Sequence, residues 1–248
     1  MGFSKYAFLA LLIPISFLLL FGCTQPVSGQ PGQNPANSSN PLDPFNTQVA
    51  SGVAKDAKYF VNEGLALYQS GDIAGAKNSF DKAIAADSKY APAFFARGQF
   101  LQSQTDFNNA LKDYNSAIAL DPEFLQPYEA KCNLLNLGRF YNESLLTCEK
   151  AMALGSSSPQ VFNDLGISKF KTGDINGSIV EFTRSLELGA DDPQVYRSRA
   201  IALNQINEFE SAASDLKEYL KLVPDDNQTK FYLQQIESKI NDTLIGGK

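Results

Sequence analysis

The sequence of 248 residues contains no histidine. Histidine is the commonest general base and metal ligand in proteins, so its absence excludes His-dependent catalytic triads, His-containing zinc sites and His proton shuttles. The sequence also holds no Gly-rich phosphate loop, no paired-carboxylate site and no cluster of metal-ligating residues. We therefore predict a protein that is not an enzyme, with no catalytic residues, no metal and no cofactor.

Basic residues are few, because 21 Lys and Arg stand against 27 Asp and Glu and give a formal net charge of −6. Binding of nucleic acid requires clustered Lys and Arg that neutralise phosphates. Electrostatic binding to anionic lipid requires clustered basic residues as well. We therefore expect no nucleic-acid partner and no electrostatic attachment to lipid.

Long apolar runs are also scarce, and the clearest one lies at the N-terminus, where no charge occurs between residues 7 and 22. The run is short for a membrane-spanning helix, which needs about 20 apolar residues. It follows Lys5, so we interpret residues 1–22 as an export signal. The run leads into the sequence Leu20-Phe21-Gly22-Cys23.

This sequence resembles the lipobox of prokaryotic lipoproteins, although Phe21 stands where a small residue is usual. The resemblance implies that Cys23 is the lipid attachment site and the first residue of the mature chain. An uncleaved signal anchor is the alternative. Both interpretations place the remaining chain outside the cytoplasm, anchored to a membrane of a prokaryotic cell envelope.

Residues 23–50 are rich in Pro, Gly, Ser, Asn and Gln and are nearly uncharged. Such a segment cannot bury enough apolar surface to offset the entropy lost on ordering. We predict a flexible tether between the signal sequence and a folded part that begins near residue 51.

The folded part repeats with a period of 34 residues, without insertion, over units 57–90, 91–124, 125–158, 159–192 and 193–226. The fourth position is always aromatic, and the twentieth is always small. The eighth position holds Gly64, Gly98, Cys132, Gly166 and Ala200. The twenty-fourth position holds Phe80, Tyr114, Cys148, Phe182 and Leu216.

These columns resemble those of the tetratricopeptide repeat family, over about 170 of the 248 residues. The resemblance implies an all-α fold with two antiparallel helices per unit, stacked into a right-handed α-solenoid. The residues agree, since apolar and small residues in each second helix recur at steps of three and four and so share one face. Residues 227–248, with an amphipathic stretch at 228–241, are expected to form a capping helix and tail.

The resemblance also implies a partner-binding groove lined by the first helix of each unit, where family members hold proteins or peptides. Positions two, five, nine, twelve and thirteen point inward by this analogy. The residues expected in the groove are Tyr68, Phe95, Gln99, Asn133, Asn136, Asn163, Phe170, Arg197 and Asn204. Amides can bond a peptide backbone, and exposed rings can take apolar side chains. The alternative is that these positions are ordinary solvated helix faces.

Two further features concern covalent modification. Cys132 and Cys148 occupy core columns of one unit, and an exported protein permits a disulfide between them; two buried thiols are the alternative. Sequons at Asn142 and Asn176 fall at the same position of successive units and could carry glycans in an archaeal host.

We interpret the chain as a membrane-tethered, extracytoplasmic scaffold that mediates protein–protein interaction in an envelope or surface assembly. One alternative is a structural envelope module that self-associates through its ends. Another is an accessory subunit whose groove binds glycan or peptide, although the absence of Trp disfavours sugar binding.

Overall fold

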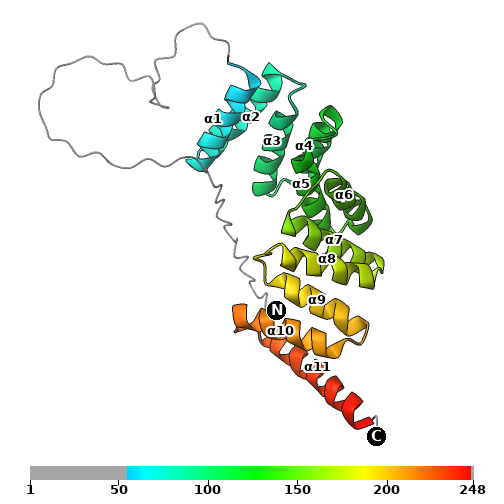
Figure 1. Ribbon diagram of the computed structural model, residues 1–248. Helices are drawn as coiled ribbons and strands as arrows, with labels where there is room; N and C mark the ends of the chain where they lie inside the picture. The colour runs from blue at the N-terminus through cyan, green and yellow to red at the C-terminus, as the bar shows by residue number, and fades with distance from the viewer. Residues whose placement is uncertain (1–54, 247–248) are drawn as a thin grey trace, which may run out of the picture. The chain divides into compact units, whose positions relative to one another are not determined.

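The computed structural model describes residues 55–246, with side chains to residue 242. These residues form eleven α-helices and no strand (Figure 1). The helices are α1 (Ala57–Gln69), α2 (Ile73–Ala86), α3 (Ala91–Ser103), α4 (Phe107–Leu120), α5 (Leu125–Leu137), α6 (Tyr141–Ala153), α7 (Pro159–Thr172), α8 (Ile175–Glu187), α9 (Gln194–Gln205), α10 (Phe209–Leu222) and α11 (Asn227–Gly246). Ten of them form five antiparallel pairs, and α11 packs on α10 at the C-terminal end. The predicted all-α solenoid with a terminal capping helix is confirmed.

The 34-residue period sets where the helices begin. Every second helix begins at position seventeen, directly after position sixteen, which holds Asp72, Asp106, Phe140, Asp174 and Glu208. The carboxylates of Asp72 and Asp174 accept hydrogen bonds of 2.8 and 2.9 Å from the backbone N–H three residues later. An N-cap of this kind satisfies one of the N–H groups that the first turn leaves free.

The turn inside each pair places position fifteen in the left-handed region of backbone conformation. The φ angles there are 86° at Gly71, 62° at Thr105, 62° at Arg139, 98° at Gly173 and 64° at Asn207. Glycine adopts this conformation without steric cost, and Asn tolerates it, but a β-branched residue is strained. Thr105 is the residue at this position that fits worst.

We expect Thr105→Gly to raise the free energy of unfolding by about 0.5–1 kcal/mol, because relief of the strain exceeds the entropy that glycine adds to the unfolded chain. Urea denaturation measures the change. Asn207→Gly is the matched control and should change stability by less than half as much. A loss of stability at Thr105→Gly would show that the turn holds no strain.

The core of each pair joins positions eight and twenty-four. A Cβ atom added to Gly64, Gly98 or Gly166 would lie within 2.6–2.7 Å of the ring at position twenty-four of the same unit. Glycine is therefore required because the aromatic ring packs directly on the backbone of the first helix. In the fifth unit the pair is Ala200 with Leu216, both fully buried, so a larger residue at one position accompanies a smaller one at the other.

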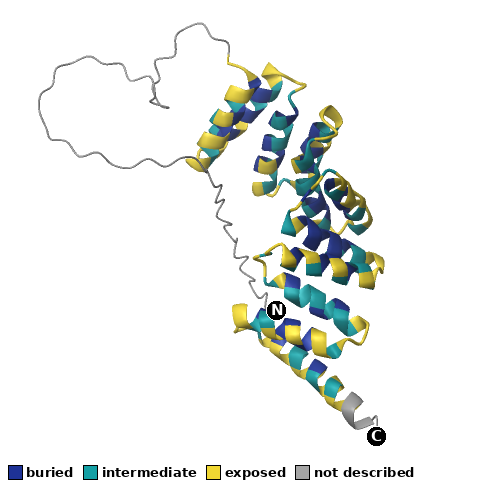
Figure 2. Ribbon diagram, in the orientation of Figure 1, coloured by how far each residue is buried: buried dark blue, intermediate teal, exposed yellow. Residues whose placement is uncertain are grey.

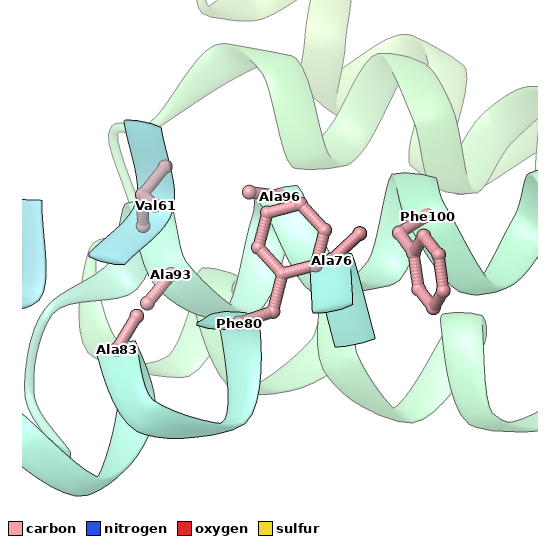
Figure 3. Close-up of a cluster of buried hydrophobic side chains, with 7 residues drawn as sticks. All are labelled: Val61, Ala76, Phe80, Ala83, Ala93, Ala96 and Phe100. Carbon is pink, nitrogen blue, oxygen red and sulfur yellow. The ribbon is translucent and has the colours of Figure 1, made fainter. Parts of the chain in front are cut away.

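Neighbouring units share their cores. Figure 3 shows one cluster, which combines Val61, Ala76, Phe80 and Ala83 of the first unit with Ala93, Ala96 and Phe100 of the second. The rings of Phe80 and Phe100 have centroids 5.5 Å apart. Each unit thus completes its core only against the next, as expected of a repeat array in which single units are unstable. Burial is greatest at α7, in the middle of the array (Figure 2).

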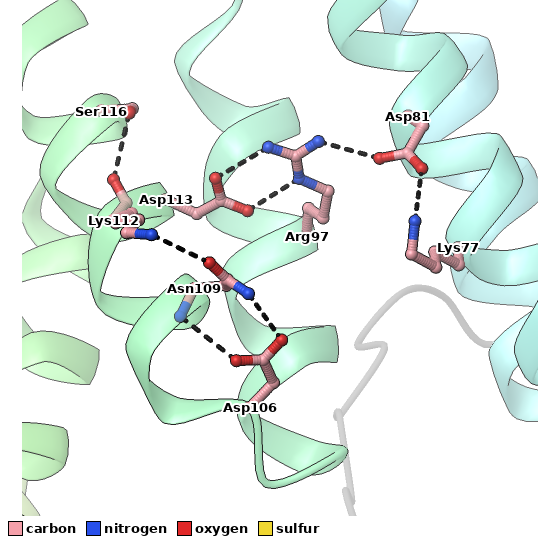
Figure 4. Close-up of polar contacts among 8 residues, drawn as sticks. All are labelled: Lys77, Asp81, Arg97, Asp106, Asn109, Lys112, Asp113 and Ser116. Carbon is pink, nitrogen blue, oxygen red and sulfur yellow. Dashed lines mark hydrogen bonds and ion pairs between the residues drawn. The ribbon is translucent and has the colours of Figure 1, made fainter.

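An arginine bridges the first two units. The Arg97 guanidinium donates to both oxygens of Asp113, at 2.8 and 2.9 Å, and to Asp81 of the preceding unit at 2.8 Å (Figure 4). Arg199 and Asp215 repeat the two-bond pair in the fifth unit, at 2.7 Å for both bonds. Such two-bond pairs fix the relative position of two helices better than a single contact does.

Candidate functional site

The candidate site is the surface formed by the first helices of the pairs. These helices contact one another in succession, α1 with α3, α3 with α5, α5 with α7 and α7 with α9. We call the exposed surface of these five helices the inner face. It is the place where the predicted groove residues lie.

The aromatic residues predicted for the inner face are partly covered by neighbouring helices. Tyr68 is half-buried and meets the ring of Phe100 edge-on, with centroids 5.8 Å apart. Phe95 is half-buried against Tyr114 and Phe124 at 6.0 and 5.3 Å. Each ring therefore packs between helices and has only part of its surface open. An aromatic residue at position five or twelve is therefore not necessarily exposed enough to contact a ligand.

Phe170 is covered in the same way, because it is half-buried against the cluster of Phe182, Val195 and Ala202. Gln99, by contrast, is exposed on α3. Its amide is therefore free to reach a partner in solution. Asn204, half-buried on α9, accepts a 2.9 Å hydrogen bond from Lys239 of α11.

Asn133 and Asn136 meet in a polar cluster between the third and fourth units. The Asn133 side chain donates to the Asp164 carboxyl at 3.2 Å, and the Asn136 side chain donates to the Asp164 backbone carbonyl at 2.7 Å. Ser168 donates to the Asn136 side-chain oxygen at 2.9 Å. These amides join α5 to α7, so part of their hydrogen-bonding capacity serves the array itself.

Asp164 is the polar residue of this face that the sequence did not single out. It lies at position six, beside the predicted Asn163, and only 3% of its surface is exposed. Burial raises the pKa of its carboxyl to about 6, against the opposing effect of hydrogen bonds from Asn133, Gln160 and Asn136. In the sequence, the only feature that could have pointed to Asp164 was an acidic residue directly beside the inward position five.

We expect Asp164→Asn to remove a pH dependence of stability. The pKa of an unfolded Asp is about 3.9, and that of folded Asp164 is about 6. The folded state therefore binds the proton more tightly, and its stabilising contribution is complete below pH 4 and lost as pH rises through 6. A shift of this size corresponds to about 3 kcal/mol in full, of which somewhat more than about 2 kcal/mol is lost between pH 4 and pH 7.5.

Urea denaturation of both proteins at pH 4, 5, 6 and 7.5 measures this difference. The stability of Asp164→Asn relative to the unchanged chain should rise by about 2 kcal/mol from pH 4 to pH 7.5. Asp191→Asn is the control at an exposed carboxylate and should show no rise of this sign. Parallel pH profiles of Asp164→Asn and the unchanged chain would contradict the assignment.

Asn163 and Arg197 hold side-chain atoms whose hydrogen bonds are not made within the array. Asn163 is 5% exposed, and its Oδ1 is buried without a partner. The Nε of the half-buried Arg197 is buried without a partner as well. Both residues occupy position five, in the fourth and fifth units, on helices α7 and α9 that contact each other. These are the predicted residues with an unmet requirement for a partner.

Cys132 and Cys148 are joined by a disulfide, with their Cα atoms 5.2 Å apart. Both residues are fully buried, and they occupy positions eight and twenty-four, where three other units place glycine and an aromatic ring. The Ser144 hydroxyl donates to the Cys132 carbonyl at 3.0 Å. The disulfide therefore replaces the glycine–ring contact of the other units within the core.

Asn142 and Asn176 are exposed, each at the second residue of a second helix. Asn142 lines a shallow hollow together with Arg139 and Lys171. The serines that complete the two sequons, Ser144 and Ser178, are fully buried. The amides are thus accessible in the folded protein, whereas the serine of each sequon is not.

The predicted signal sequence, Cys23 and the whole tether, residues 23–50, lie outside the described residues. Within residues 55–246, no helix is long and apolar enough to cross a membrane. In the same part of the chain, no group of three or more His, Cys, Asp or Glu side chains is placed to hold a metal ion.

Five helical pairs with a continuous inner face define a helical-repeat scaffold, the class of fold that mediates protein–protein interaction. Residues 61–123 match the tetratricopeptide repeat family. The match lies within the first two units, and all five helical pairs share one fold, so the predicted tetratricopeptide-repeat fold is confirmed. No curated protein matches the chain.

Solved structures share the fold at low sequence identity. MamA from Desulfovibrio magneticus RS-1 superposes with a TM-score of 0.62 at 14% identity, covering 71% of this chain and 99% of that one. YrrB, described as a TPR protein with an unusual peptide-binding site, gives 0.63 at 16% identity, covering 73% and 93%. The APC/C hetero-tetramer Cut9–Hcn1 gives 0.58 at 17% identity, covering 73% of this chain and 36% of that one. At these identities the likeness concerns the fold.

Proposed function

We propose that this protein is a non-catalytic scaffold, tethered to the extracytoplasmic side of a prokaryotic membrane, that holds segments of partner proteins along its inner face. The observation that carries the proposal is the unpartnered Oδ1 of Asn163, which is buried on α7, one of the helices that form the inner face. A buried polar atom without a hydrogen bond is costly, by about 1–3 kcal/mol. A bound backbone N–H would satisfy it.

The amide content of the inner face supports binding of a peptide backbone. Gln99 is exposed, and an amide side chain offers both a donor and an acceptor to a peptide group. The half-buried rings of Tyr68, Phe95 and Phe170 leave apolar edges beside these amides. Extended segments bound through backbone hydrogen bonds and shallow apolar contacts fit such a surface.

Two observations support the extracytoplasmic location. The Cys132–Cys148 disulfide belongs to a class of bond that forms and persists in oxidising compartments and is rare in the cytosol. The apolar run that ends at Cys23 suits export and lipid attachment. The membrane anchor is then the lipidated Cys23, followed by the tether.

Cys23→Ser tests the anchor in the native host. If Cys23 is the lipid attachment site, the variant should carry no lipid and should retain its leader. Mass spectrometry of the N-terminal peptide would show both changes. A chain whose mass and membrane association are unchanged by Cys23→Ser would contradict lipid attachment and favour the uncleaved signal anchor.

Photocross-linking in the native host tests the binding surface. A photoreactive residue at Gln99 on α3 is compared with one at Asn115, an exposed amide on α4 of the same unit. A discrete partner captured from Gln99 and not from Asn115 supports the proposal and identifies the partner. Equal labelling from both positions, or none, would reject the inner face as the binding surface.

A further inference from the structure

We propose that the C-terminal half of the inner face recognises an acidic side chain of the bound segment, with Arg197 pairing its carboxylate and Asn163 accepting a neighbouring backbone N–H. This inference rests on the proposed function and names the chemistry of the ligand. It concerns helices α7 and α9, which contact each other.

Arg197 differs from the arginines that hold the array together. Arg97 and Arg199 each make a two-bond pair with an aspartate, Asp113 and Asp215. Arg197 makes no hydrogen bond or ion pair within the described residues, and its Nε is buried without a partner. A guanidinium has five N–H donors and no acceptor. We therefore expect a ligand to supply the acceptor that the Arg197 Nε–H lacks within the array.

Carboxylates that could neutralise Arg197 are lacking on its own helix and scarce on the neighbouring one. Helix α9 contains no Asp or Glu, and α7 contains only Asp164. Asp164 is 3% exposed and bonded to Asn133. On the C-terminal side, Glu237 of α11 pairs with Lys217 at 2.9 Å.

The cations of α7 and α9 are more numerous than their acids. Lys169 pairs with Glu181 at 2.6 Å, and Arg199 pairs with Asp215. Lys171 has no ion pair, and its Nζ lies 5.5 Å from the centroid of the Phe170 ring. Lys171 and Arg197 therefore make this half of the first helices locally positive, although the chain carries a formal net charge of −6.

The two unmet groups complement one residue of a bound chain. Arg197 supplies donors suited to a carboxylate, and guanidinium–carboxylate pairs are frequently bidentate. Asn163, at the same position one unit earlier, supplies an acceptor oxygen suited to a backbone N–H. An Asp or Glu side chain within an extended segment provides both partners, which a neutral side chain would not.

Selection from a random dodecapeptide library against the full-length chain in detergent tests the proposal. The unchanged chain is expected to enrich peptides that carry Asp or Glu at one fixed position. In a selected peptide synthesised with both ends capped, Glu→Gln at that position should weaken binding about tenfold. With Arg197→Gln, the Glu and Gln peptides should bind equally. Capped peptides exclude a terminal carboxylate as the group recognised.

Arg184→Gln is the matched control, because it removes the same charge from an exposed position on α8. It should leave the tenfold preference intact. Thermal unfolding shows whether Arg197→Gln folds, and its midpoint should be close to that of the unchanged chain, since Arg197 makes no hydrogen bond or ion pair that the substitution would remove. Arg197→Lys should retain part of the preference.

The outcomes separate the inference from the proposed function. Enriched peptides without an acidic position, or a Glu preference that survives Arg197→Gln, would overturn the inference and leave the scaffold standing. Failure to enrich any peptide over the detergent-only control would count against the binding of extended segments and, with it, against the inference.

Discussion

Reduction of the Cys132–Cys148 disulfide is expected to lower the free energy of unfolding by about 3 kcal/mol, because the bond closes a loop of about 15 residues. The two cysteines are 16 residues apart and join α5 to α6. Both are fully buried, so the reduced chain is prepared by unfolding and refolding in reductant. Urea denaturation of the oxidised and reduced chains gives the difference.

The double variant Cys132→Gly with Cys148→Phe tests whether the disulfide takes the place of the glycine–ring contact found in other units. It restores the glycine–ring contact that the first and fourth units make, where an added Cβ would lie within 2.7 Å of the ring. We expect its stability to be within about 1 kcal/mol of the oxidised chain and to be insensitive to reductant. Equal stability of the oxidised and reduced chains would contradict a structural role for the disulfide.

Asp113→Ala is expected to lower the free energy of unfolding by about 3–4 kcal/mol, because it leaves the Arg97 guanidinium with half its partners. The Asp113 side chain is 7% exposed and accepts two bonds from Arg97. The pKa of Arg97 is raised by its hydrogen bonds to Asp113. Arg97 keeps its charge in the variant even without this effect, because a guanidinium stays protonated in proteins. Urea denaturation measures the loss.

Asp81→Ala is the control for this prediction, because Asp81 contacts the same guanidinium from the preceding unit but is 40% exposed. Exposed ion pairs contribute about 0–1 kcal/mol, so the loss should be below 1 kcal/mol. Equal losses for the two variants would show that burial does not set the strength of the pair. The comparison also separates contacts within a unit from those between units.

The period of 34 residues was sufficient to predict the fold. It placed glycine and aromatic residues in columns eight and twenty-four, and the structure brings Gly64 against Phe80 and Gly166 against Phe182. The start of each second helix followed from the same columns, because Asp72 and Asp174 are effective N-caps. A pattern that recurs five times carries enough information to fix local structure.

The polar contacts between units could not be predicted in this way. Arg97 bonds Asp113 of its own unit and Asp81 of the preceding one. Only the fifth unit repeats the arginine–aspartate pair, so the columns do not predict this bridge for every unit. The strained turn at Thr105 was hidden too, because its sequence carries no glycine. Such features depend on individual side chains and on tertiary packing.

The analogy with the repeat family placed the inner-face residues on the first helices. It did not predict how far each side chain is buried or which hydrogen bonds it makes. Phe95 and Phe170 pack between helices because the units approach closely enough for a large ring to lie against a core cluster shared with the next unit. Asp164 was missed because position six belongs to the helix contact as much as to the surface. The distinction between Asn163 and Asn133 required knowledge of their hydrogen bonds.

Hydrogen–deuterium exchange, with and without the partner captured from Gln99, tests most directly whether the inner face holds partner proteins. The account predicts slower exchange on binding in α3, α5, α7 and α9, with the strongest protection in α7 and α9 beside Asn163 and Arg197. Exchange in α4, α6 and α8 should be unchanged. Protection confined to those second helices would contradict the account and place the binding surface on the opposite side of the array.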